Sequence, residues 1–221
     1  MLKNGLKIVL LGPQASGKGM QSKLLSELLN ISKVSTGEIF RKEIIDGTKI
    51  GKEIEESISS GILISNDLTF KVLKKKLESM NFRDGFILDG YPRSIEQARH
   101  LEKIVNIDFV VLINISNEES VKRIENRRVC EKCGKSYDLK IFPPKKKNKC
   151  DKCDGKIIRR IDDYPEAIRK RLLIYREEVR PIIRFYKNKN ILISVNGDNE
   201  FKNVFNEIKE KMIKKMGNKI M

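Results

Sequence analysis

Long apolar runs are missing from this sequence of 221 residues. Near its start, continuous apolar residues extend only from Ile8 to Leu11 before a glycine follows. Such a run is too short for the apolar segment of a signal peptide or for a membrane-spanning helix. Hydrophobic residues still make up 39% of the chain and charged residues 34%, a composition typical of a folded soluble protein. We therefore expect a protein of the cytoplasm that has no membrane partner.

Histidine and cysteine are scarce. The one histidine, His100, lies in an expected surface helix, and we predict no catalytic task for it. The four cysteines form two pairs, Cys130-x2-Cys133 and Cys150-x2-Cys153, separated by sixteen residues. This spacing is typical of a tetrahedral four-cysteine zinc site, and a reducing compartment favours metal over disulfides, which are the alternative. Because protein ligands would fill all four positions, the Zn2+ would be structural and would do no chemistry.

Acidic residues are outnumbered, with 30 Asp and Glu against 46 Lys and Arg. The segment from Lys122 to Arg160 holds 15 Lys and Arg against 5 Asp and Glu, and so carries +10 of the net charge of +16. Clustered positive charge is typical of phosphate-binding surfaces, which makes a basic zinc ribbon that binds nucleic acid an alternative. The aromatic residues near these cysteines are only Tyr137 and Phe142, few for a base-stacking surface, so we expect no nucleic-acid partner.

Short apolar runs alternate with amphipathic helical segments along much of the chain. The runs lie at residues 8–11, 86–88, 109–115 and 191–195, and the first is followed by a predicted helix from Lys18 to Leu29. That helix places Leu24, Leu25, Leu28 and Leu29 on one side. The alternation predicts an α/β fold with a doubly wound parallel sheet that binds ligands at the carboxyl ends of its strands.

Two segments interrupt this alternation. Helices are predicted at residues 37–46, 49–60 and 65–80 with no strong strand signal among them, which indicates a helical insertion on the substrate side. A helix from Asn117 to about Arg127 precedes a stretch rich in glycine, proline, lysine and cysteine, and helical periodicity resumes near Asp163. We expect this second stretch to be a small folded insertion.

A phosphate loop is predicted from Gly12 to Lys18, where the sequence Gly-Pro-Gln-Ala-Ser-Gly-Lys follows a strand and opens a helix. Glycines there allow backbone N–H groups to surround phosphate oxygens, and Lys18 adds a mobile positive charge. The alternative is a chance glycine turn. Gly19 and Met20 follow the lysine, so no hydroxyl stands next to it to hold magnesium. The chain also contains no DxxG motif, which argues against a regulatory GTPase.

With these motifs in this order, the sequence resembles the adenylate kinase family. The resemblance rests on Gly12–Gln21, Ser35–Arg41, Gly85–Arg93 with Gln97, Arg123 with Arg127, Arg160 with Asp162 and Asp163, and Arg171. It implies an α/β fold of the phosphate-loop kinase type in three parts. These are a core domain (1–35, 82–128 and 161–221), an AMP-binding helical insertion (36–81) and a small zinc-stapled lid (129–160).

The resemblance also implies a reaction, in which ATP and AMP are converted reversibly into two ADP beneath a mobile lid that excludes water. Mg2+ would accompany the triphosphate and Zn2+ would sit in the lid. The implied partners are ATP, AMP and ADP, and a monomer is the default. A GTP-preferring AMP phosphotransferase is the nearest alternative.

By resemblance, residues in three groups form the site. The donor nucleotide would contact Gly12, Ala15, Ser16, Gly17, Lys18, Gly19, Met20, Arg123, Arg127, Ser136, Tyr137 and Asn199. AMP would contact Thr36, Arg41, Ile62, Leu63, Ile64, Gly90, Tyr91, Pro92, Arg93, Gln97, Arg160 and Arg171. The catalytic residues would be Lys18, Asp89, Arg93, Arg127, Arg160 and Arg171, with Asp89 holding the water shell of magnesium.

One position departs from the family pattern, which usually has threonine where this chain has Met20. The lost hydroxyl removes a contact to phosphate or to the waters of magnesium, an effect of about 1 kcal/mol. The substitution therefore predicts slower or weaker handling of the donor.

Overall fold

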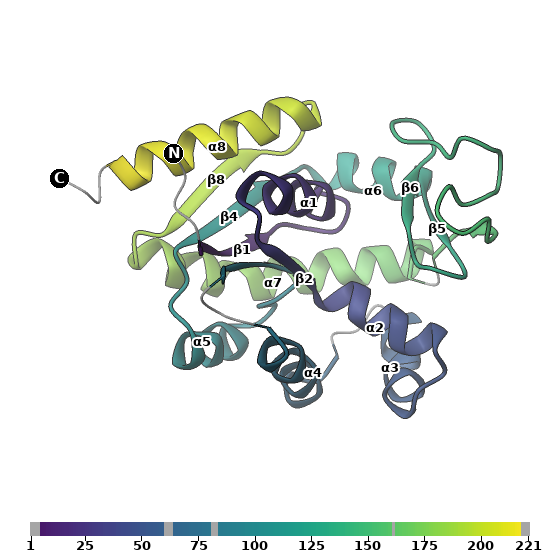
Figure 1. Ribbon diagram of the computed structural model, residues 1–221, viewed down its shortest axis with the longest axis horizontal. Helices are drawn as coiled ribbons and strands as arrows, with labels where there is room; N and C mark the ends of the chain where they lie inside the picture. Colours follow the sequence, from purple (N-terminus) through teal and green to yellow (C-terminus); the bar gives the residue numbers. More distant parts are fainter. Residues whose placement is uncertain (1–4, 60–63, 81–83, 161, 218–221) are drawn as a thin grey trace. The chain divides into compact units, whose positions relative to one another are not determined.

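A computed structural model describes residues 5–59, 64–80, 84–160 and 162–217 of the chain (Figure 1). The described helices are α1 (Lys18–Leu29), α2 (Thr36–Ile45), α3 (Lys49–Ser59), α4 (Asn66–Glu78), α5 (Ile95–Ile104), α6 (Asn117–Asn126), α7 (Pro165–Asn188) and α8 (Phe201–Gly217). The described strands are β1 (Lys7–Leu11), β2 (Ser32–Ser35), β3 (Phe86–Asp89), β4 (Phe109–Asn114), β5 (Arg127–Cys130), β6 (Ser136–Asp138), β7 (Ile157–Ile158) and β8 (Leu192–Asn196).

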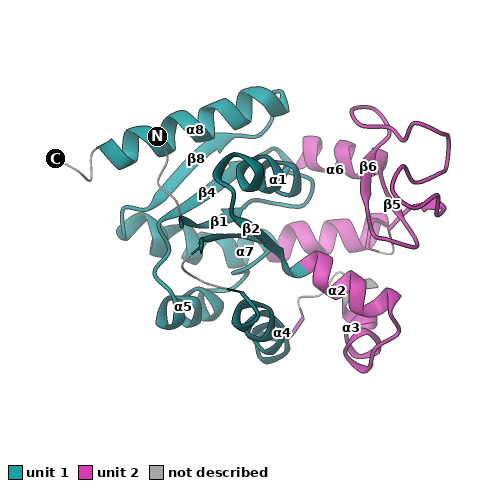
Figure 2. Ribbon diagram, viewed as in Figure 1, with its two compact units in different colours: residues 1–36, 65–116, 175–221 teal, residues 37–64, 117–174 magenta. Residues whose placement is uncertain are grey.

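The chain forms two compact units (Figure 2). The first unit contains residues 1–36, 65–116 and 175–221, and the second contains residues 37–64 and 117–174. Helix α7 contributes to both units, because its first half belongs to the second unit and its last half to the first. The two units are described separately below.

A five-stranded parallel sheet in the order β2-β3-β1-β4-β8 forms the centre of the first unit. The predicted α/β fold with a doubly wound parallel sheet is therefore confirmed. The strand β2 was not predicted, because Ser32, Lys33 and Ser35 leave only Val34 as an apolar residue within it. It lies at the edge of the sheet, where a strand needs fewer apolar side chains.

Helices cover both faces of this sheet. Figure 1 shows α1 and α8 on one side, and α5 with the end of α7 on the other. Between the sheet and the first pair of helices lies a continuous apolar core. Its buried side chains include Ile8, Leu10, Leu25, Leu29, Val111, Ile113, Ile193, Val195, Val204, Ile208 and Met212.

Only part of the predicted leucine face of α1 is buried. Leu25 is fully buried and Leu29 is 7% exposed, whereas Leu28 is 50% exposed and Leu24 is half-buried. At 3.6 residues per turn, the four leucines span too wide an arc for one sheet to cover them all. The four leucines share one side of the helix, as predicted, but only Leu25 and Leu29 on that side are buried.

The second unit combines helices with a small antiparallel sheet. It contains α2 after its first residue, α3, α6 and the first part of α7, together with the strands β6-β5-β7. The predicted folded insertion is present, but its strands are only two to four residues long. Strands this short carry no readable alternation of apolar and polar residues, so the sequence did not predict them.

No helix in the described ranges is both long enough and apolar enough to cross a bilayer.

The burial difference between Leu25 and Leu28 gives a test of the core. Leu25→Ala should lower the free energy of unfolding by about 2 to 5 kcal/mol, because it leaves a cavity beneath α1. Leu28→Ala, one turn further along the same helix, should change it by less than about 0.5 kcal/mol. Urea unfolding followed by circular dichroism measures both. Equal losses for the two variants would contradict the packing described for α1.

Candidate functional site

The loop from Gly12 to Lys18 joins β1 to α1 at the carboxyl edge of the parallel sheet. A β-carbon at Gly12 would lie 2.5 Å from Ser16 Oγ and 2.6 Å from the carbonyl oxygen of Ile113, so only glycine fits there. Gly17 has φ 89° and Ala15 has φ 58°, left-handed conformations that turn the backbone sharply before the helix. Because a helix then begins at Lys18, the positive end of its dipole lies at this loop, which favours an anion there.

The Lys18 ammonium folds back over this loop. Its Nζ donates hydrogen bonds to the carbonyl oxygens of Gly12 (2.7 Å) and Pro13 (2.6 Å), and lies 3.3 Å from Ser16 Oγ. A flexible lysine held by carbonyl oxygens can exchange them for phosphate oxygens at modest cost. The arrangement fits a phosphate-binding lysine.

Asp89 ends β3, the strand next to β1 in the sheet. Its carboxylate is 8% exposed, and a β-carbon at Gly19 would lie 3.7 Å from Asp89 Oδ2. The carboxylate therefore faces the first turn of α1, where Met20 is half-buried. A carboxylate beside a phosphate loop is chemically suited to hold the water shell of Mg2+.

Thr36, Gly90 and Arg93 gather at the same edge of the first unit. Thr36 Oγ1 and Arg93 Nε both donate to the carbonyl oxygen of Gly90, each at 2.8 Å. Gly90 has φ 84°, and a β-carbon there would lie 3.0 Å from Thr36 Oγ1. Glycine at this position lets the threonine and the arginine converge on one carbonyl.

Gln97 lies in the first turn of α5 and is 4% exposed. Its Oε1 accepts a hydrogen bond from the backbone N–H of Arg93 at 2.7 Å, and its Nε2 donates to Asn66 Oδ1 at 2.7 Å. The hydroxyl of buried Tyr91 donates to the carbonyl oxygen of Gln97 at 3.2 Å. The segment around Pro92, also buried, is thus tied to α5 and to the start of α4.

Asn199 is an exposed residue in the turn after β8. It belongs to the first unit, as do all the loop residues from Gly12 to Met20.

In the second unit, three arginines converge on two buried aspartates. Arg127 Nε donates to Asp163 Oδ2 at 2.7 Å, and its Nη2 bonds the other carboxylate oxygen. Arg160 binds Asp162 through two parallel hydrogen bonds of 2.8 and 2.7 Å. Arg171 Nη1 donates to the same carboxylate at 2.7 Å. The carboxylates fix three guanidinium groups that come from β5, the segment after β7 and α7.

The charges of this cluster shift several pKa values. Burial alone would raise the pKa of Asp162, but the charges of Arg160, Arg171 and Arg127 outweigh it and hold that pKa well below its usual range. Burial alone would lower the pKa of Arg127, but the hydrogen bonds and charge of Asp163 outweigh it and raise the pKa. The Asp162 carboxylate and the Arg127 guanidinium therefore stay ionised at neutral pH.

Arg41, on α2, has the opposite shift. Burial, followed by the positive charge of Arg160, lowers the pKa of its guanidinium to about 9. The Arg127 charge acts in the same direction, whereas Asp162 and Glu38 partly compensate. Such an excess of positive charge would be relieved by an anionic ligand.

The remaining predicted residues of the second unit are more dispersed. Arg123, on α6, binds Glu119 Oε1 at 2.7 Å, and Ser136 is exposed on β6. Ile64 is half-buried before α4. The predicted residues Ile62 and Leu63 lie outside the described part of the chain.

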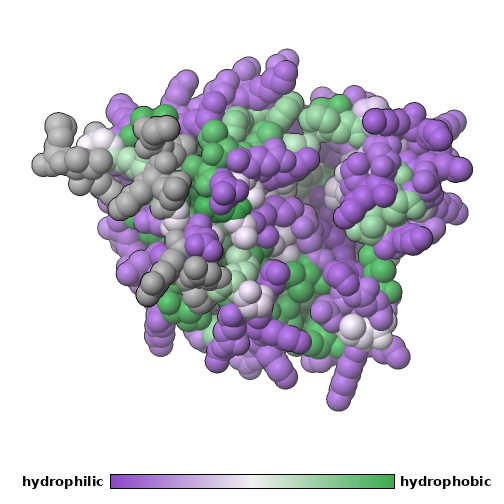
Figure 3. All heavy atoms as spheres, in the orientation of Figure 1, coloured by the Kyte–Doolittle hydropathy of each residue, from purple (hydrophilic) through white to green (hydrophobic). Residues whose placement is uncertain are grey.

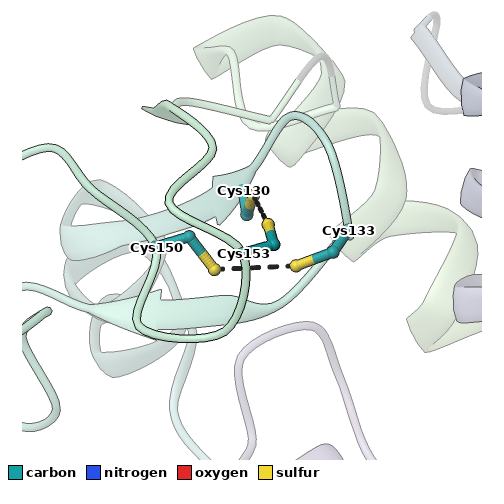
Figure 4. Close-up of side chains that lie close together, drawn as sticks. All are labelled: Cys130, Cys133, Cys150 and Cys153. Carbon is teal, nitrogen blue, oxygen red and sulfur yellow. Dashed lines mark hydrogen bonds between the residues drawn. The ribbon is translucent and has the colours of Figure 1, made fainter.

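The four cysteine side chains point toward one another (Figure 4). The Sγ atoms of Cys130 and Cys153 are 3.4 Å apart, those of Cys133 and Cys150 are 3.6 Å apart, and all four lie within 4.8 Å of one another. All four are free cysteines, which excludes the disulfide alternative for this structure. Four thiolates at about 2.3 Å from one tetrahedral ion would lie about 3.8 Å apart, so the cluster fits a metal.

Tyr137 is buried among these cysteines rather than displayed on the surface of β6. Its hydroxyl lies 3.3 Å from Cys150 Sγ, to which it donates, and accepts a hydrogen bond from the backbone N–H of Asp151 at 2.8 Å. The ammonium of Lys135 lies over its ring, 4.9 Å from the centre. The side chain of Tyr137 thus supports the cysteine cluster, and only its backbone is available for the predicted contact with the donor.

Hydrophilic side chains cover most of the visible surface around β5 and β6 (Figure 3). Between β6 and β7, lysines 140, 145, 146, 147 and 149 are exposed, as are the apolar residues Leu139, Ile141 and Phe142. These lysines of the basic segment are therefore exposed, whereas Tyr137, one of the two aromatic residues near the cysteines, is buried and cannot stack with bases.

Two groups of supporting residues were given no role in the prediction from the sequence. Asp162 and Asp163 were named only as part of the family pattern. Two adjacent acidic residues in a strongly basic segment are nevertheless a signal of ion pairing. Asn66 was not singled out, because its contact with Gln97 joins residues 31 positions apart.

Comparison with known proteins agrees with this architecture. The family model described as "Adenylate kinase" matches residues 10–191. Curated proteins named adenylate kinase from Thermosipho africanus, Methanothrix thermoacetophila and Clostridium kluyveri are 41%, 39% and 40% identical to the chain over 208, 214 and 209 residues. These alignments cover 92%, 95% and 92% of this chain and 97%, 99% and 96% of the relatives. The chain belongs to the adenylate kinase family.

Proposed function

We propose that this chain transfers the terminal phosphoryl group of ATP to AMP, reversibly, and so forms two ADP. Beyond family membership, the observation that carries this proposal is the arginine cluster of the second unit. Arg41, Arg127, Arg160 and Arg171 together exceed the charge of Asp162 and Asp163. Phosphoryl transfer needs little covalent help from the protein, and neutralising charge on the phosphates while aligning them supplies most of the rate.

The phosphate loop would hold the donor. Backbone N–H groups from Gly12 to Met20 would surround its phosphates, with Lys18 exchanging loop carbonyls for phosphate oxygens. Mg2+ bound with the triphosphate would neutralise charge on its phosphates. Asp89 would hold the waters of that ion, since no hydroxyl follows Lys18.

The acceptor would be AMP. Its α-phosphate would bind Arg41 and Arg93, whose guanidinium groups can each present two parallel N–H donors. Gln97 would bind the edge of the adenine, and Thr36 and the Gly90 turn would form the floor of the site. The backbone of residues 62–64 would pass the adenine ring.

The remaining arginines would act on the transferring group. Arg127, Arg160 and Arg171 would stabilise its developing charge, with Arg123 contributing to the donor side together with Ser136, Tyr137 and Asn199. We further propose the three-part division into a core (1–35, 82–128 and 161–221), an AMP-binding part (36–81) and a lid (129–160). Closure of the lid would exclude water, so that the phosphoryl group passes to AMP rather than to solvent.

We propose that the four cysteines hold one structural Zn2+. The apolar core around them is small, formed with Tyr137 and Ile157. A metal held by four thiolates can replace the missing apolar contacts as a source of stability. With all four positions filled by protein, the ion would have no open position for chemistry. We also propose that the protein works in the cytoplasm as a monomer.

The acceptor and donor can be identified in one assay. Purified chain with Mg2+ should form ADP rapidly from ATP and AMP, and much more slowly when UMP or GMP replaces AMP. Parallel reactions with GTP as donor decide between ATP and GTP preference. Absence of turnover with every acceptor, in folded and metal-loaded protein, would contradict the proposal and favour a binding role.

The role of the arginine cluster has a matched control on α7. Arg171→Ala should lower kcat/KM by about 100-fold or more, the loss expected when one charge-stabilising donor is removed. Arg176→Ala, at an exposed position of the same helix, should leave it nearly unchanged. Equal activity of the two variants would refute the role assigned to Arg171.

Metal binding can be measured independently of activity. Elemental analysis should find one zinc per chain, and a strong chelator should lower the melting temperature of the wild type. Cys153→Ser should lose the metal, whereas Lys152→Ala, between the last two cysteines, should retain it. A wild type that carries no metal, or whose melting temperature is unaffected by metal removal, would contradict a structural zinc.

A further inference from the structure

The amide of Gln97 lies between a hydrogen-bond donor and a hydrogen-bond acceptor. The backbone N–H of Arg93 faces its Oε1 and the Oδ1 of Asn66 faces its Nε2, each at 2.7 Å. A glutamine amide can in principle rotate by half a turn and exchange the positions of its oxygen and its NH2 group. Only the partners around it decide which orientation is kept.

Here the rotated orientation would lose both hydrogen bonds. A backbone N–H can only donate, so the rotated amide would place an NH2 group against the N–H of Arg93. It would also place an oxygen against Asn66 Oδ1, because the hydrogen bond that this oxygen accepts from the Ser94 hydroxyl at 3.4 Å favours the present orientation of the Asn66 amide. Because Gln97 is only 4% exposed, each group left without a partner would carry a desolvation cost.

The orientation matters because adenine and guanine present opposite patterns. Adenine offers an acceptor at N1 and a donor at its 6-amino group, whereas guanine offers a donor at N1 and an acceptor at O6. In the observed orientation Gln97 still has one N–H and one oxygen lone pair that these two partners do not use. A base placed in one position can satisfy both only if its pattern matches the orientation of the amide.

We propose that Asn66 is a specificity-determining residue. It keeps the Gln97 amide in the orientation that matches adenine and disfavours the rotated orientation, which would match guanine. This inference rests on the proposed function, in which AMP is the acceptor and Gln97 binds its base. Asn66 acts through Gln97 and is a positioning residue. It begins α4, and its Oδ1 also lies 3.4 Å from the hydroxyl of Ser94, which caps α5.

The position of Asn66 permits a clean substitution. It is an exposed residue in the first turn of α4, where alanine is compatible with a helix. Asn66→Ala removes the acceptor for Gln97, whereas Asn66→Asp keeps an oxygen in its place. Asp67→Ala, at the next exposed position, is the matched control.

The measured quantity is the ratio of kcat/KM for AMP to that for GMP, with ATP as the donor. Asn66→Ala should lower this ratio about tenfold, the change that about 1.4 kcal/mol produces. Asn66→Asp and Asp67→Ala should keep the wild-type ratio. Thermal melting of each variant checks that the fold is retained, and the ratio remains informative even where overall activity falls.

Gln97→Ala separates failure of this inference from failure of the proposed function. If Gln97→Ala lowers the ratio and Asn66→Ala does not, Asn66 has no part in selection and the inference is wrong. If neither variant changes the ratio, Gln97 does not bind the base, and the acceptor site proposed above fails together with the inference. The inference is supported if Asn66→Ala lowers the AMP-to-GMP ratio of kcat/KM and Asn66→Asp keeps the wild-type ratio.

Discussion

Two buried carboxylates, Asp162 and Asp163, hold the positive charge of the second unit in place. Guanidinium groups close together repel one another, and without a counter-charge they would turn outward into water. The two aspartates bind Arg127, Arg160 and Arg171 through charged hydrogen bonds, so these arginines are positioned before any phosphate arrives. Positive charge remains beyond that of the two carboxylates; together with burial, which is the larger cause, it lowers the pKa of Arg41, and an anion would relieve it.

In the first unit, neutral backbone and side-chain amide groups orient the side chains of the site. Backbone carbonyl oxygens of Gly12 and Gly90 hold Lys18, Thr36 and Arg93 at the carboxyl edge of the sheet. Gln97 is fixed in the same way by the backbone of Arg93 and by Asn66. In both units, side chains that would touch nucleotides are held in place by neighbouring protein groups before a nucleotide binds, which reduces the reorganisation needed during the reaction.

Much of the fold could be predicted from the sequence because its signals are local. The glycine loop, the apolar strands of the sheet and the paired cysteines can each be recognised from a few consecutive residues. Strand β2 and the short strands of the second unit did not, since their stability comes from neighbours distant in the chain. The same holds for Asn66 and for the burial of Tyr137 among the cysteines, because neither side chain has a neighbour in sequence that marks its contact.

The dependence of the arginine cluster on its carboxylates is tested most directly by the stability of Asp162→Asn, measured by urea unfolding between pH 7 and pH 3. A carboxylate whose pKa is lowered by folding stabilises the folded state above its unfolded pKa of about 3.9, and that stabilisation is lost as pH falls toward the folded pKa. The wild type should therefore be more stable than Asp162→Asn by about 3 kcal/mol at pH 7, with a difference that shrinks below about pH 4. Glu125→Gln, at an exposed position of the same unit, should show no such difference. Equal stability of wild type and Asp162→Asn at pH 7 would contradict the central role given to these carboxylates.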